Sequence, residues 1–115
     1  MNDTEKYNWS EWRDFPNPLK KEILVSPFGA GIYQLKNKRT DQFVLFGRGD
    51  HLSHRMTSLL PHPYGEGTRK NKKKREYVWN NIDYIEYRTI ACLTHEETVE
   101  IEREIRELKI HIFNS

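Results

Sequence analysis

Two strand-like segments separated by a short polar connection constrain the fold of this chain more than any other feature. Residues 31–36 alternate in polarity, residues 43–47 form a short apolar run, and the residues between them combine turn formers with charge. This pattern is typical of a β-hairpin, whose antiparallel strands can be joined by only a few residues. The sequence therefore predicts an antiparallel sheet that contains this hairpin.

A helix over residues 95–108 is the clearest of the remaining elements. Thr94 is followed three positions later by Glu97, the capping-box pattern that satisfies free backbone N–H groups at the start of a helix. An apolar stripe follows at helical spacing and consists of Thr98, Ile101, Ile105 and Leu108. We expect this face of the helix to flank the sheet.

Three further elements complete the predicted domain. Apolar residues recur at helical spacing from Leu52 to Leu59, which predicts a helix over 51–60. Another helix is expected to begin near the basic run at 69–75. Residues 84–93 alternate in polarity and become apolar at their end, which predicts a third strand.

Residues 1–29 are predicted to form an aromatic extension packed on the domain. Trp9 and Trp12 lie at helical spacing in a segment rich in aromatic residues, and this spacing predicts one short helix. A second short helix is expected over 19–25. The aromatic side chains should cover the core of the main domain, which occupies residues 30–115.

Composition indicates one small, highly charged domain. The 115 residues suit a single core, and 36% of them are apolar while 31% are charged. A formal charge of +2 does not by itself indicate a nucleic-acid binder. Cys92 is the only cysteine, which excludes an intramolecular disulfide, and its apolar neighbours favour a buried thiol. No apolar run approaches the ~20 residues that span a bilayer, so we expect a cytoplasmic protein without membrane contact.

Several short motifs follow one another along the predicted elements. They are Gly31-Ile32-Tyr33 on the first strand, Leu45-Phe46-Gly47 on the second, Arg55 eight residues later, Ile101-Glu102 on the long helix and Asn114 twelve residues beyond Glu102. In this order and spacing, the chain resembles the GIY-YIG nuclease family over residues 30–114. The ordered set carries the resemblance, because each three-residue motif alone is common by chance.

The resemblance implies an α+β fold with a small antiparallel three-stranded sheet flanked by helices. It also implies a metal-dependent endonuclease that hydrolyses phosphodiester bonds in DNA, with RNA as an open alternative. By resemblance, Tyr33 is the base that activates water and Glu102 binds Mg²⁺ or Mn²⁺. Arg55 clamps the phosphate, and Asn114 braces the far side of the site. Glu104 is the alternative metal ligand.

The second motif departs from the family pattern, because Leu45 stands where the family has a tyrosine. A phenol that donates and accepts a proton is thereby replaced by a hydrocarbon. Either Tyr33 carries the proton chemistry alone, or another residue replaces the phenol, or the chain is an impaired fold that binds nucleic acid or protein. The family's histidine is Leu59 here, and His54 and His62 are its candidate substitutes.

Positive charge is concentrated in one run that suits contact with the phosphate backbone, although a solvated surface explains the run equally well. The residues predicted to bind nucleic acid are Arg48, Arg69, Lys70, Lys72, Lys73, Lys74 and Arg75. His51 and His54 have the spacing of helical metal ligands but lack the glutamate of a zinc protease helix. An immunity or inhibitor protein is a candidate partner, and the oligomeric state stays open.

Overall fold

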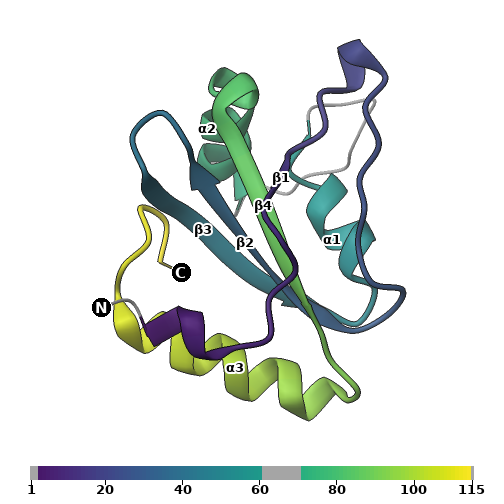
Figure 1. Cartoon of the computed structure of the whole chain (residues 1–115), viewed down its shortest axis with the longest axis vertical. Helices are drawn as coiled ribbons and strands as arrows, with labels where there is room; N and C mark the ends of the chain where they lie inside the picture. Colours follow the sequence, from purple (N-terminus) through teal and green to yellow (C-terminus); the bar gives the residue numbers. More distant parts are fainter. Residues whose placement is uncertain (1–2, 61–70, 115) are drawn as a thin grey trace.

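The computed structural model describes residues 3–60 and 71–114, which form an antiparallel sheet with helices on both faces (Figure 1). The sheet has four strands in the order β1-β4-β2-β3, so the α+β class agrees with the prediction. The strands and α-helices are β1 (Arg13–Asp14), β2 (Gly31–Asn37), β3 (Gln42–Gly49), α1 (Leu52–Thr57), α2 (Lys72–Asn80), β4 (Ile85–Ala91) and α3 (His95–Leu108). Short 3-10 helices span Asp3–Lys6, Pro18–Lys20 and Ile82–Tyr84. Within this described part, no helix has the length and apolar character needed to cross a membrane.

The predicted hairpin is confirmed as β2 and β3. Tyr33 lies directly opposite Gly47 in the register of the two strands. The register shifts beyond the pair of Leu35 and Leu45, so that Val44 is an extra residue on β3. Such a bulge turns two neighbouring side chains to one side. Val44 and Leu45 accordingly both pack in the same apolar cluster.

The prediction of a three-stranded sheet is wrong, because the N-terminal extension supplies a fourth strand. Arg13 and Asp14 pair with Tyr87 and Glu86 on β4. Phe15, the next residue, is fully buried in the main core. The spacing of Trp9 and Trp12 therefore does not mark a helix, since this segment meets its hydrogen-bonding needs at the open edge of β4.

The predicted helix over 19–25 is also absent from the described chain. A single turn of 3-10 helix spans Pro18–Lys20 and ends at Lys21, whose φ of 57° is left-handed. Beyond it, Val25 is held by the side chain of Tyr87, which accepts from the Val25 N–H and donates to the Val25 carbonyl. A side chain thus takes over the hydrogen bonds that a helix would have made internally.

Two apolar clusters lie on opposite faces of the sheet. The larger one packs α1 and α2 on the sheet through Leu52, Met56 and Val78. The smaller one packs α3 on the other face through Ile105, which contacts Ile32, Phe46 and Ile90. Each face therefore has its own core.

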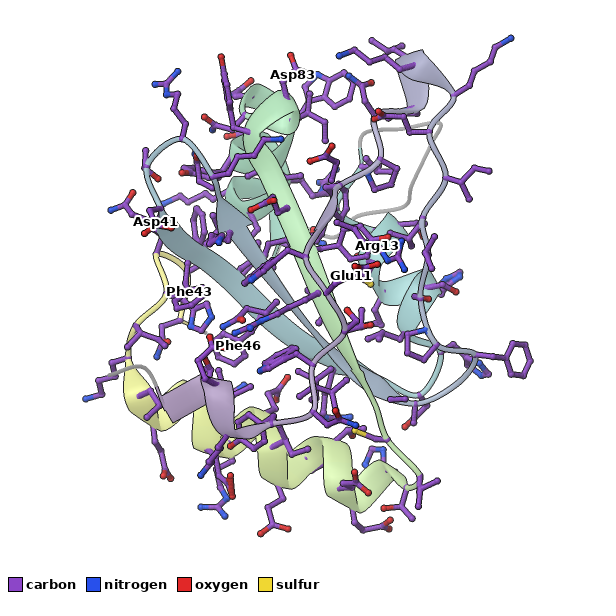
Figure 2. The ribbon with its side chains drawn as sticks, viewed as in Figure 1. Glu11, Arg13, Asp41, Phe43, Phe46 and Asp83 are labelled. Carbon is purple, nitrogen blue, oxygen red and sulfur yellow. The ribbon has the colours of Figure 1, made fainter. Side chains whose placement is uncertain are left out.

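α3 begins and ends at the predicted residues. The Thr94 hydroxyl accepts from the Glu97 N–H, as the capping-box pattern predicts, and Lys109 ends the helix with a φ of 53°. The chain then returns along β3, where Ile112 and Phe113 donate to the carbonyls of Phe43 and Val44. Figure 2 shows Phe43 beside this C-terminal segment. The tail thus covers the edge of β3 near the start of the strand.

A buried arginine fastens the N-terminal extension to the sheet. Arg88 on β4 is only 4% exposed and lies between the rings of Trp9 and Trp12, 4.4 and 4.5 Å from their centroids. Its guanidinium donates twice to Glu5, at 3.0 and 2.9 Å, and once to Gln34 at 2.7 Å. The two tryptophans are therefore explained by cation–π stacking on one arginine.

Candidate functional site

A cleft of about 490 Å³ lies beside β3, at the part of this edge strand that the C-terminal tail does not cover. It is lined by Tyr33, Phe46, Gly47, Arg48, Gly49, Asp50, Arg55, Lys74, Glu102 and Arg106. Three predicted catalytic residues meet here from three different elements: Tyr33 from β2, Arg55 from α1 and Glu102 from α3. The cleft therefore gathers a phenol, a guanidinium and a carboxylate.

Two glycines of β3 make room for the functional side chains. A Cβ on Gly47 would come within 2.5 Å of the Tyr33 hydroxyl oxygen and 2.6 Å of its Cζ atom. A Cβ on Gly49 would overlap the Cγ atom of Arg55. The Gly-Arg-Gly segment at 47–49 thus lets the phenol and the guanidinium stem lie directly on the strand, which any larger residue would prevent.

Tyr33 is neutral at rest. It is 7% exposed, and burial raises the pKa of its hydroxyl from 10.0 to about 12, with Arg55 opposing the rise and Glu102 adding to it. A phenol with this pKa donates a hydrogen bond at neutral pH and gives up its proton only when further positive charge enters the cleft.

Glu102 is held by two arginines. Its Oε1 atom lies 2.9 Å from the Arg106 guanidinium, one helical turn along α3, and 3.8 Å from Nε of Arg48 on β3. The side chain is 19% exposed. Arg106 was not among the predicted site residues, although its spacing of four residues from Glu102 is the signal that would have found it.

Glu104, the alternative carboxylate, faces a different part of the molecule. It accepts a hydrogen bond from the Tyr7 hydroxyl and lies 3.6 Å from the Lys6 ammonium. Both partners belong to the N-terminal extension, and Glu104 does not line the cleft. The geometry of α3 therefore favours Glu102 over Glu104 as the carboxylate of this site.

Asn114 lies outside the cleft lining. Its side-chain amide donates at 2.8 Å to the Arg106 carbonyl, which also accepts from the Lys109 N–H at the C-terminal end of α3. This contact stabilises the helix that carries Glu102 and Arg106. The described contacts thus give Asn114 a supporting role, and its predicted catalytic role stays a prediction.

The basic run is divided among several surfaces. Lys74 lines the cleft, whereas Lys72 and Arg75 line a separate hollow with Glu76 and Trp79. Lys73 is exposed to solvent, and Arg48 lines the cleft from β3. Arg69, Lys70 and His62 lie outside the described residues. Of the described members of the run, only Lys74 contributes to the cleft.

Leu45 brings no polar group to the site. It lies on the same side of β3 as Gly47, but it is fully buried in the larger cluster and does not line the cleft. His54 lines an adjoining cavity together with Tyr33 and Arg55, and so stays a candidate substitute for the family's histidine. Within 3–60 and 71–114, no three His, Cys, Asp or Glu side chains gather at metal-binding distance, which leaves a zinc site at His51 and His54 without support.

A single magnesium-like ion is compatible with the cleft. Mg²⁺ often binds through one or two protein carboxylates and takes its other ligands from water and substrate phosphate. Glu102 offers such a carboxylate on the cleft wall, and Asp50 is the second one in the lining. The donor set therefore fits a hard divalent cation shared with a phosphate, and it does not fit a thiolate or imidazole metal centre.

Comparisons of the chain with protein-family models, with curated proteins and with solved structures found no match. The kind of ligand that the cleft binds is therefore inferred from the side chains that line it. Four cationic residues line it against two carboxylates, so an anionic ligand is favoured electrostatically.

Proposed function

We propose that this chain is a GIY-YIG-type endonuclease that hydrolyses phosphodiester bonds in DNA with the help of a divalent metal ion. The observation that supports this most strongly is the convergence of Tyr33, Arg55 and Glu102 on one cationic cleft. Phosphodiester hydrolysis needs a group that moves a proton, a cation for the phosphoryl oxygens and a carboxylate that holds metal. RNA is the alternative substrate, because phosphate contacts do not distinguish the two.

Arg55 binds the scissile phosphate. Its guanidinium presents paired donors that match two phosphoryl oxygens, and the overlap with a Cβ on Gly49 means that its stem lies flat on β3. Mg²⁺ or Mn²⁺ on Glu102 would neutralise charge at the same phosphate. Arg48 and Arg106 hold the Glu102 carboxylate in place through their ion pairs.

Tyr33 first releases its own proton to solvent and then, as a phenolate, accepts a proton from the attacking water. The water oxygen bonds to phosphorus as the bond to the leaving oxygen breaks, and the leaving oxygen takes a proton from solvent. The negative charge of Glu102 contributes to the raised pKa of Tyr33, while Arg55 opposes it. A divalent cation held by Glu102 would offset the negative charge of this carboxylate. It would therefore lower the pKa of Tyr33 toward the range in which the phenolate can act as a base.

Cleavage assays on single- and double-stranded DNA and RNA with Mg²⁺ or Mn²⁺ test this function. We expect metal-dependent cleavage that Tyr33→Phe and Glu102→Gln each lower by about 10²-fold or more. As a control, Glu107→Gln removes an exposed carboxylate from the same helix and should leave the cleavage rate unchanged. Glu104→Gln tests the alternative metal ligand, and a loss of cleavage in this variant would favour Glu104. Absence of metal-dependent cleavage of all four substrates would contradict the proposal.

A nucleic-acid-binding module that no longer cuts is the second candidate. It is favoured by the fully buried hydrocarbon of Leu45 and by the raised pKa of Tyr33. In that case the wild-type protein would bind oligonucleotides without cleaving them, with an affinity that falls steeply with salt. Neutralising Lys72, Lys73 and Lys74 together would then abolish binding to nucleic acid. If the chain instead binds a protein through another surface, the same substitutions would leave that binding unchanged.

A further inference from the structure

Lys74 occupies the junction of two adjoining cavities. The first is the cleft beside β3, and the second is a hollow of about 220 Å³ on the side of α1. Three side chains line both cavities: Tyr33, Arg55 and Lys74. A ligand that enters either space therefore meets this cation together with the two residues proposed to handle the reacting phosphate.

The position of Lys74 is fixed by the packing of α2. Lys74 lies four residues before Val78, so both side chains project from one face of the helix. Val78 is fully buried in the larger apolar cluster. The neighbouring Tyr77 accepts a hydrogen bond from Asn37 at 3.1 Å, which ties the helix to the end of β2. The helix face that packs on the sheet thus also directs Lys74 to the cleft.

The electrostatics of Lys74 fit an anion between the cations. Lys74 is half-buried, and burial lowers the pKa of its ammonium, with Glu102 opposing the shift and Arg55 and Arg106 adding to it. A half-buried ammonium beside two guanidinium groups favours a bound anion in the space that they line.

We propose that Lys74 is a catalytic residue that donates to a non-bridging oxygen of the reacting phosphate. This inference rests on the proposed nuclease function and deepens it. Lys74 acts by charge and hydrogen bonding and neither gives up nor takes a proton.

The neighbouring lysine provides a sharp comparison. Lys73 directly precedes Lys74 on the same helix and is exposed to solvent. A contact between Lys73 and nucleic acid would be a backbone contact that changes affinity and its salt dependence. A contact between Lys74 and the reacting phosphate strengthens as charge develops and therefore changes kcat.

Single-turnover and steady-state cleavage of one oligonucleotide by three Gln variants and one Arg variant tests the proposal. Lys74→Gln should lower kcat by about 10²-fold with little change in KM, and Lys74→Arg should restore most of the loss. Lys73→Gln should act on KM, and Lys20→Gln, which removes an ammonium paired with Asp83, should leave activity unchanged. Equal kcat values for Lys74→Gln and Lys73→Gln would overturn the inference.

A binding measurement separates failure of this inference from failure of the nuclease function. NMR of lysine side chains, recorded as a dinucleoside monophosphate is added, should shift the Cε signal of Lys74 well before that of Lys73. If the wild-type protein shows this shift but does not cleave, the proposed nuclease function is wrong, and the assignment of Lys74 as a phosphate ligand still holds. A shift of Lys73 without one of Lys74 would overturn the inference whether or not the protein cleaves.

Discussion

The hydroxyl of Tyr33 lies over the backbone of Gly47, its cross-strand partner, at a point where a Cβ would come within 2.5 Å of the oxygen. Gly47→Ala should therefore push the phenol off the strand. We expect a loss of stability of about 1–3 kcal/mol from overpacking and a fall in cleavage comparable to that of Tyr33→Phe. Chemical denaturation and cleavage assays measure the two effects separately.

Gly49→Ala is the matched control for Gly47→Ala. Its added Cβ meets the flexible stem of Arg55 instead of an aromatic ring, so the protein should lose less stability. The displaced guanidinium should weaken phosphate binding and raise KM. A Gly47→Ala protein with full activity and unchanged stability would show that the Tyr33 hydroxyl is not held on this strand.

Alkaline titration should report the burial of Tyr33. The folded pKa of about 12 lies above the unfolded value of 10.0, so the neutral phenol stabilises the fold below pH 10 and this contribution is lost as pH rises toward 12. Tyr33→Phe should remove one late-titrating phenol from the absorbance change at 295 nm. Glu102→Gln should lower the pKa of Tyr33, because it removes a charge that raises it.

His111 should make the fold sensitive to acid. Burial, with Arg88 adding to it, lowers the pKa of this imidazole from 6.5 to about 4. The neutral ring therefore stabilises the fold above pH 6.5, and this contribution, on the order of 3 kcal/mol, is lost as pH falls from 6.5 to 4. Urea denaturation at pH 7 and pH 4.5 should show a smaller difference for His111→Gln, which keeps a partner for the Gln34 amide.

Arg88 should control the attachment of the N-terminal extension. Arg88→Met removes the guanidinium that joins Glu5, Gln34 and two tryptophans, and leaves the Gln34 carbonyl without its donor. We expect a loss of about 1–3 kcal/mol, because the buried Gln34 carbonyl loses its donor, and early proteolysis between residues 6 and 14. Glu5→Gln should cost less, because the Glu5 side chain is 58% exposed and glutamine keeps an oxygen acceptor for the guanidinium. Equal protease resistance of Arg88→Met and wild type would contradict this role.

Elements defined by local patterns were predicted well. The hairpin and the long helix depend on alternation, turn residues and the Thr94 cap, all of which act within a few residues of the chain. The helix predicted over 51–60 is shorter, at Leu52–Thr57, because Leu59 and Leu60 are buried in a turn that follows it. The third predicted strand forms over Ile85–Ala91.

Features that depend on distant partners escaped the sequence analysis. The pairing of Arg13 with Tyr87 needs the edge of β4, and no local pattern marks that edge. The same holds for the cleft. The resemblance to the GIY-YIG family implied that Tyr33, Arg55 and Glu102 share one site, but no feature of the sequence distinguished Lys74 from its basic neighbours. Asn114 matched a spacing rule, yet the turn after Lys109 directs its amide to the Arg106 carbonyl.

Because the cleft wraps around an edge strand, its two walls can be altered separately. Tyr33, with Arg55 on α1 and Lys74 on α2, belongs to the sheet face built on the larger cluster, whereas Glu102 is carried by α3 on the opposite face. Repacking around Ile105 would move the carboxylate relative to a stationary phenol. Substitutions in one core would thus shift the carboxylate and substitutions in the other would shift the phenol, with β3 as the shared reference.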